Sequence, residues 1–177
     1  AFWHREQDVP SFKKTITGSS VEIETDFLHL KYQSTALGFS SKTLSITLKQ
    51  TGVTWRYGES QKENLKGTAR TLEGVAGTTR LENGLLSRSG WSVVDDSKSL
   101  VFNESGWLEP RESHRVGIFK SLKASSKDLY FFGYGPDFAA CLRDFTRICG
   151  SVPMVPRFIL GNWWSRFWAY TQDELKS

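Results

Sequence analysis

The chain has 177 residues and a formal net charge of +4, and 38% of its residues are hydrophobic. This length suffices for one domain with a real hydrophobic core. Lysines and arginines are dispersed rather than clustered, and no apolar run approaches the roughly 18 residues of a membrane span, so we expect neither a nucleic-acid partner nor a membrane partner.

Short strands are predicted from Phe12 to Gly133. Apolar and polar residues alternate over 44–49, Thr51-Gly52 marks a turn, and the alternation resumes at Val53, which is typical of a β-hairpin. Further strands are predicted at 21–24, 28–32, 91–94, 100–102 and 128–132, with a long loop over 58–77. Many short strands joined by turn residues favour a mainly β fold, an antiparallel β-sandwich over residues 1–135.

A helix and a connector are predicted over residues 136–156. The helix begins at Pro136-Asp137, and Gly150 ends it. Its apolar residues recur at helical spacing: Phe138, Cys141, Leu142, Phe145, Ile148 and Cys149. Two prolines within Val152–Pro156 make the following segment extended and stiff.

The cysteines and histidines indicate neither a disulfide nor a metal site. Cys141 and Cys149 are separated by about 12 Å along the axis of the predicted helix, too far for a disulfide, and we expect both to be buried. The three histidines have no ligand spacing, so no metal is predicted. Neither a nucleophile elbow nor a phosphate loop is present, and no cofactor is predicted.

Aromatic residues are concentrated in Phe158–Tyr170, which contains three tryptophans and only one charged residue. Such a segment predicts either a strand buried on both faces or the floor of a ligand pocket. Thr171-Gln-Asp-Glu174 is a capping box that begins a new helix. Because the few residues that follow are too short for a stable helix, we expect the chain to be the front part of a longer polypeptide.

Several long motifs resemble glycoside hydrolase family 31, whose members include α-glucosidases and α-xylosidases. They appear in this order: Gly67-Thr-Ala-Arg-Thr-Leu-Glu73, Leu81-Glu-Asn-Gly-Leu-Leu-Ser-Arg-Ser-Gly-Trp-Ser-Val-Val-Asp-Asp-Ser97, Asp128-Leu-Tyr-Phe-Phe-Gly-Tyr-Gly-Pro-Asp137, Val152-Pro-Met-Val-Pro-Arg157 and Gly161-Asn-Trp-Trp-Ser-Arg-Phe-Trp-Ala-Tyr170. The resemblance covers about the second two-thirds of the chain.

The resemblance implies a galactose-mutarotase-like β-sandwich followed by the helix and the start of a (β/α)8 barrel. Residues 157–177 would then hold the first barrel strand, Phe158–Trp164, and the start of the first barrel helix. The family hydrolyses α-linked sugars with retention, using an aspartate nucleophile and an aspartate acid/base about 5–5.5 Å apart. In the family both lie on later barrel strands, so this chain alone is expected to be inactive and to have no catalytic residues.

The resemblance also implies that a sandwich loop reaches the sugar at the barrel mouth. The matching loop is Leu86–Ser97, and its candidate substrate-binding residues are Arg88, Ser89, Asp95 and Asp96. Many relatives have an acidic residue directly after the loop arginine, where this chain has Ser89.

Two of these residues also have a simpler interpretation. Asp95-Asp96-Ser97 is typical of a turn that closes on its own backbone, and adjacent strand residues point to opposite faces, so the two aspartates do not form a catalytic pair.

Aromatic and basic side chains near the end of the chain are further candidates for sugar contact. Trp163, Trp164 and Trp168 either stack on a sugar ring or pack in the interior. Arg166 lies at the end of the predicted strand, where it either reaches a barrel site or pairs with a carboxylate beneath the sandwich. Trp91 and Trp107 are predicted to lie in the sandwich core.

The expected partners are an α-linked oligosaccharide and the rest of the same polypeptide. The alternative function is a non-catalytic carbohydrate-binding β-sandwich module. The identity of the sugar and the cellular location are not indicated by the sequence.

Overall fold

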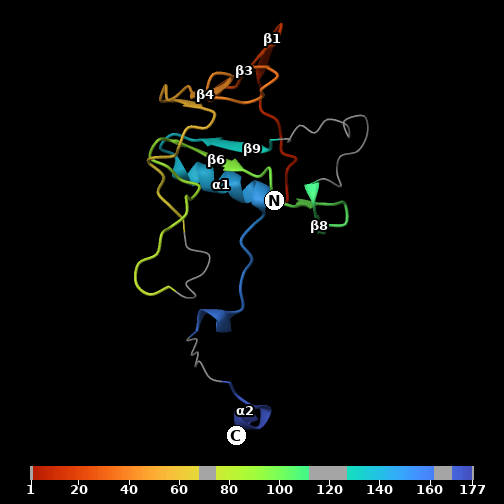
Figure 1. Ribbon diagram of the computed structural model, residues 1–177, viewed down its shortest axis with the longest axis vertical. Coiled ribbons are helices and arrows are strands. Elements are labelled where there is room, and N and C mark those ends of the chain that lie inside the picture. Colours follow the sequence, from red (N-terminus) through yellow and green to blue (C-terminus); the bar gives the residue numbers. More distant parts are fainter. Residues whose placement is uncertain (1, 68–74, 112–126, 162–168, 177) are drawn as a thin grey trace.

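The computed structural model describes residues 2–67, 75–111, 127–161 and 169–176 (Figure 1). The described part of the chain is mainly β, with antiparallel sheets and few helices, as predicted. Its elements are, in chain order, β1 (Lys13–Thr17), β2 (Ser20–Glu24), β3 (Leu28–Gln33), β4 (Leu44–Leu48), β5 (Thr54–Arg56), β6 (Trp91–Asp95), β7 (Val101–Phe102), β8 (Leu108–Glu109), β9 (Leu129–Gly133), α1 (Phe138–Cys149), the 3-10 helix η3 (Arg157–Leu160) and α2 (Gln172–Lys176).

Strands β1 to β5 form one antiparallel sheet in which each strand pairs with the next along the chain. The predicted hairpin joins β4 to β5, and the backbone N–H of Gly52 donates to the carbonyl of Leu48 at 2.8 Å. Gly52 has a φ of +73°, which a residue without a Cβ adopts freely. Alternation along β4 puts three side chains on the buried face: Leu44, Ile46 and Leu48.

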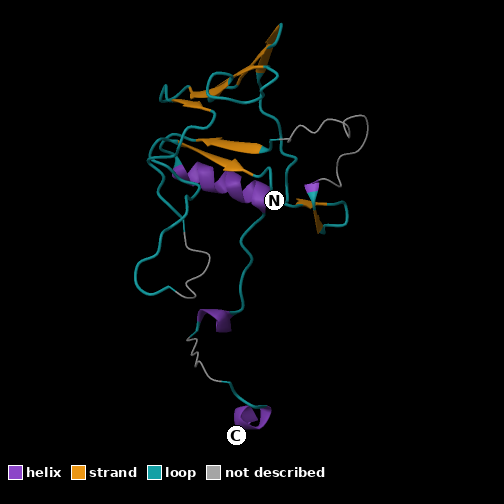
Figure 2. Ribbon diagram, viewed as in Figure 1, coloured by secondary structure: helices purple, strands orange, loops and turns teal. Residues whose placement is uncertain are grey.

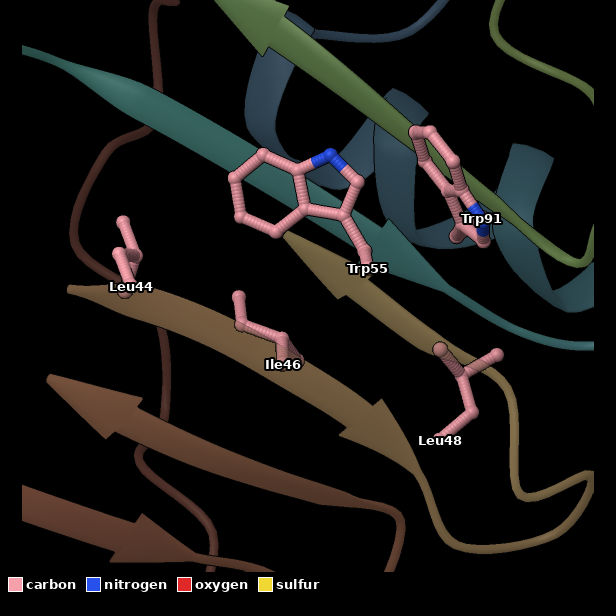
Figure 3. Packing of buried hydrophobic residues seen from close by; sticks show 5 residues of the cluster. All are labelled: Leu44, Ile46, Leu48, Trp55 and Trp91. Carbon is pink, nitrogen blue, oxygen red and sulfur yellow. The ribbon is translucent and has the colours of Figure 1, made fainter. Parts of the chain in front are cut away.

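Strands β6 and β9 form a separate antiparallel pair that packs against one face of the five-stranded sheet (Figure 3). Trp91 of β6 and Phe131 of β9 lie on the same side of this pair, stacked with their ring centroids 6.4 Å apart. Trp55 of β5 meets them from the other sheet, 6.2 Å from Trp91 and 5.4 Å from Phe131. Trp91 therefore lies in the core, as predicted.

Helix α1 covers the opposite face of β6 and β9, so the strand pair lies between the five-stranded sheet and the helix (Figure 2). Phe132, next to Phe131 along β9, points the other way and lies 5.9 Å from Phe145 of the helix, centroid to centroid. This alternation lets a two-stranded sheet bury both of its faces. Tyr134 adds a hydrogen bond from its hydroxyl to Asp144 Oδ2 at 2.6 Å.

The predicted ends of the first helix are confirmed. The Asp137 carboxylate accepts a hydrogen bond from the backbone N–H of Ala140 at 2.9 Å, and so caps the first turn. At the other end Gly150 has a φ of +93° and donates its N–H to the carbonyl of Thr146 at 2.9 Å. The capping box at Thr171 is also confirmed, because Glu174 Oε2 accepts from the N–H and the hydroxyl of Thr171, each at 2.8 Å.

Trp107 was expected in the core, and this prediction is wrong, because the side chain is 75% exposed. It lies directly before β8, in the small β7–β8 ribbon. A two-stranded ribbon has no second layer over its outer face, so an aromatic residue beside its turn remains in solvent.

Cys149 was expected to be buried with Cys141, and this prediction is wrong for Cys149. The thiols are not bonded to each other, as predicted. Their spacing rotates Cys149 by roughly 80° around the helix relative to Cys141, away from the strand pair. Burial raises the pKa of the Cys141 thiol to about 11.

The predicted barrel strand Phe158–Trp164 is not a strand where the structure describes it. Residues Arg157–Leu160 form the 3-10 helix η3 instead. The N–H of Ile159 donates to Pro156 and that of Gly161 to Phe158, so local bonds satisfy the backbone that a strand would pair with a neighbour. The rest of the predicted strand lies outside the described residues.

Candidate functional site

The turn that carries Arg88 and Ser89 precedes β6. The Arg88 backbone N–H donates to the carbonyl of Glu63 at 2.9 Å, beside an isolated bridge between Asn64 and Ser87. The N–H of Ser89 donates to Ser87 Oγ at 3.2 Å. The Arg88 side chain is exposed and Ser89 is half-buried, so this turn presents its cation to solvent.

Asn64 joins two parts of the loop that precedes this turn, and it was not identified from the sequence. Its Oδ1 accepts from the N–H groups of Lys66 and Gly84, and its Nδ2 donates to the carbonyl of Gly84, all at 2.8 Å. Asn64 is buried, and a buried amide that uses both ends in this way fixes the backbone around it. An asparagine in a polar loop has no sequence pattern that reveals such a role.

Asp95 and Asp96 at the end of β6 have different environments. Asp95 is exposed, and its carboxylate accepts from the N–H of Ser97 at 3.0 Å, which is the predicted turn geometry. Hydrogen bonds from Ser97 hold the pKa of Asp95 below its usual value. Asp96 is buried and its Oδ2 lies 2.8 Å from Nη2 of Arg111. The adjacent aspartates therefore do not share one site, as predicted.

The structure places the four candidate residues of this loop at opposite ends of one strand. Arg88 and Ser89 precede β6, whereas Asp95 closes it and Asp96 follows. A five-residue strand separates its ends by roughly 13 Å. The loop residues are therefore not gathered around one ligand.

Asp96 belongs instead to a row of alternating charges that links three distant parts of the chain. Arg111 Nη2 lies 2.9 Å from Asp128 Oδ2, and Arg5 Nη2 lies 2.6 Å from the same oxygen. Arg111 also donates from Nε to the carbonyl of Ser99 at 3.0 Å. The two cations and two carboxylates balance, and the Arg111–Asp96 pair is mostly withdrawn from solvent.

A cavity of about 380 Å³ lies beside this row of charges. Its wall combines the N-terminal segment 2–6 with Asp96, Val101 and Phe102. Trp3 packs against Phe102 with ring centroids 4.4 Å apart and remains 51% exposed. The cavity thus has an accessible indole, an arginine and carboxylates. It was not identified from the sequence, because its walls come from segments about a hundred residues apart.

The remaining candidates, Trp163, Trp164, Trp168 and Arg166, lie outside the described residues. Among the residues that are described, no group of three or more histidine, cysteine, aspartate or glutamate side chains is arranged to hold a metal ion. In the same residues, none of the helices is both long and apolar enough to span a membrane.

No protein-family model matches the sequence, and no curated protein matches it significantly.

Proposed function

We propose that the chain is the β-rich N-terminal part of a retaining α-glycosidase of glycoside hydrolase family 31. Its first 135 residues correspond to a galactose-mutarotase-like sandwich, which shapes the substrate pocket and supports a (β/α)8 barrel. The catalytic aspartates lie elsewhere in the polypeptide. The first support for the proposal is the set of sequence motifs described above, which occur in the same order as in the family.

The observation that carries the proposal is the apolar surface of the connector after α1 and of the adjoining 3-10 helix η3. Met154 is 97% exposed, and Val152, Phe158 and Leu160 are also largely exposed. Large apolar side chains gathered on one segment are normally covered by a partner surface. The connector therefore has the character of a segment that packs against a further domain, and a barrel is the partner that the motifs imply.

The two aspartates of the candidate loop, Asp95 and Asp96, are engaged within this chain and are not arranged as a catalytic pair. Asp95 is engaged with its own turn, and Asp96 is paired with Arg111 in the interior. A retaining pair needs two carboxyl groups that face the same glycosidic bond. Arg88 is exposed in the turn before β6, and we propose that it contacts a ligand bound between this chain and the barrel.

The test uses the natural polypeptide that carries this sequence. Its intact mass should exceed that of the 177 residues by at least the roughly 250 residues of a barrel. It should hydrolyse at least one of the p-nitrophenyl α-glucoside, α-xyloside and α-galactoside, and proton NMR should show the α-anomer as the first product.

The polypeptide of 177 residues, assayed alone as the control, should show no turnover. Robust hydrolysis by it would contradict the division of roles. A natural polypeptide without a barrel, or with no α-glycosidase activity, would overturn the proposal and favour the carbohydrate-binding module.

A further inference from the structure

We propose that Asn83 is a site of spontaneous deamidation, and that Asn64 holds it unreactive while the chain is folded. Asn83-Gly84 is the only Asn-Gly pair in the sequence. The proposal goes beyond the glycosidase assignment and does not depend on it, because it concerns the chemistry of the polypeptide itself. Water is the only co-reactant.

The reaction is an attack of the Gly84 backbone nitrogen on the side-chain amide carbon Cγ of Asn83. The N–Cγ bond forms, the Cγ–Nδ2 bond breaks, and ammonia leaves with the proton of the Gly84 nitrogen. Water then opens the resulting succinimide at either carbonyl, which leaves an aspartate or an isoaspartate at position 83. A glycine in the following position favours the attack, because it has no side chain to shield the nitrogen.

The nucleophile of this reaction, the Gly84 nitrogen, is engaged by Asn64. The Gly84 N–H donates to Asn64 Oδ1, and the Gly84 carbonyl accepts from Asn64 Nδ2, both at 2.8 Å. Asn64 is buried, so water does not readily replace these hydrogen bonds. Since the nitrogen must lose its proton to form the ring, a hydrogen bond that retains this proton slows the reaction.

The electrophile, the side-chain amide of Asn83, is held as well. Lys66 Nζ donates to Asn83 Oδ1 at 2.8 Å. The amide must rotate to bring its Cγ to the following nitrogen, and this contact restrains the rotation. Asn83 is itself exposed, so water reaches it once the restraint is lost.

The backbone around the two residues is tightly packed. A Cβ placed on Gly84 would lie 2.5 Å from the carbonyl oxygen of Lys66. Lys66 has a φ of +69°, which a residue with a side chain keeps only when its surroundings hold it. Its N–H donates to Asn64 Oδ1 at 2.8 Å. Removal of the Asn64 side chain should therefore let Lys66 relax and free Gly84 at the same time.

Isoaspartate formation should disturb the turn that follows. It lengthens the backbone between positions 83 and 84, so Gly84 can no longer keep both hydrogen bonds to Asn64. The same segment continues into the Arg88 turn, and the carbonyl of Leu86 accepts from the N–H of Leu65 at 2.9 Å on the way. Protection of Asn83 thus preserves the path of the chain into that turn.

The test uses the natural polypeptide that carries this sequence, incubated at neutral pH and then digested with trypsin. Cleavage after Arg80 and Arg88 releases Leu81–Arg88, in which Asn83 is the one amide side chain. Liquid chromatography with mass spectrometry separates its asparagine, aspartate and isoaspartate forms, and a sample taken at zero time corrects for deamidation during digestion. A synthetic peptide of the same sequence gives the rate without the fold.

Asn83 should deamidate at least roughly tenfold more slowly in the polypeptide than in the peptide, since the reaction needs local opening of the loop. Asn64→Ala should raise the rate in the polypeptide by roughly tenfold, because it frees the N–H groups of both Gly84 and Lys66. Lys66→Met should raise it by about threefold, since only the contact to the Asn83 side chain is lost.

The matched control is Asn103→Ala, in the turn of the β7–β8 ribbon. Asn103 Oδ1 also accepts from two backbone N–H groups, those of Ser105 and Trp107, at 3.0 and 2.9 Å. This variant therefore loses a comparable set of hydrogen bonds in a different turn, and it should leave the rate at Asn83 within about twofold of the parent. Far-UV circular dichroism shows whether each variant folds.

The proposal is overturned if Asn83 reacts as fast in the polypeptide as in the peptide, or if a folded Asn64→Ala variant keeps the parent rate. An equal increase for Asn103→Ala would also overturn it. If Asn64→Ala does not fold, Lys66→Met at its exposed position decides, and an unchanged rate there would contradict the proposal. None of these outcomes depends on glycoside hydrolysis, so a failure here is distinguishable from a failure of the glycosidase proposal.

Discussion

At the scale of single residues, one close backbone approach beside the site is between Gly90 and Gly135. Gly90, directly before β6, has a φ of +76°, and a Cβ placed there would lie 2.8 Å from the Cα of Gly135. The Gly90 carbonyl also accepts from the N–H groups of Tyr134 and Gly135 at 3.1 and 2.9 Å. This contact joins the Arg88 turn to the segment that leads into α1.

Gly90→Ala should therefore destabilise the chain by about 2 kcal/mol or more, because a left-handed φ and a backbone clash act together. The matched control is Gly58→Ala, since Gly58 has a φ of +85° and a Cβ placed there would have no neighbouring atom within 4 Å. That variant should lose only about 1 kcal/mol. Urea denaturation measures both, and equal losses would show that the Gly90–Gly135 approach is not tight.

At the scale of elements, α1 and η3 show when local sequence determines secondary structure. The first helix has a capping aspartate, apolar residues at helical spacing and a terminal glycine, and it forms as predicted. The segment 157–160 is apolar after Arg157 but has no partner strand among the described residues, and it forms a 3-10 helix. Caps act within one turn of the chain, whereas a strand needs a neighbour to pair with.

Asp137→Ala should cost about 1 kcal/mol of stability, because the N–H of Ala140 loses the carboxylate that accepts from it at the start of α1. Asp137→Asn should cost less than about 0.5 kcal/mol, since an asparagine oxygen caps nearly as well. Thermal unfolding followed by circular dichroism measures the two differences. An alanine variant as stable as the parent would mean that packing, and not the cap, determines where the helix begins.

At the scale of the whole molecule, the β6–β9 pair connects the five-stranded sheet to α1. Its two faces carry Phe131 and Phe132, which contact Trp55 and Phe145 respectively. A two-stranded sheet alone is marginally stable in water, so both layers are needed to hold it. The aromatic cluster around Trp55 is therefore expected to dominate the stability of the described fold.

Trp55→Ala should lose about 3–5 kcal/mol because it opens a cavity between the two sheets. Trp107→Ala should change stability by less than about 0.5 kcal/mol, because its side chain is already in solvent. Urea midpoints compare the two, and Trp55→Phe provides a milder core variant if the alanine variant does not fold. Similar losses for Trp55→Phe and Trp107→Ala would contradict the assignment of the core.

The candidate site was predictable only in part. The turn at Asp95 was predictable, because an aspartate two residues before a serine at the end of a strand is typical of such a turn. The structure forms this turn as expected. The row of charges was not predictable, because Arg5 and Asp128 are 123 residues apart and neither has a local pattern that indicates the other. Trp107 was assigned to the core because a tryptophan near a strand usually packs, and the sequence does not show which ribbons lack a covering layer.

The sequence by itself determined most of the strands, the β4–β5 hairpin and both ends of α1, because period-two alternation, turn glycines and capping side chains act over a few residues. It did not predict β1 or β8. Only the tertiary structure decided that β6 and β9 pair across more than thirty residues of chain, that Asp96 is buried against Arg111, and that the N-terminal segment forms a cavity wall beside β7. Those contacts depend on how whole strands and helices pack against one another. Many packing arrangements are compatible with the same alternation, turn and capping patterns, so these patterns alone do not select one.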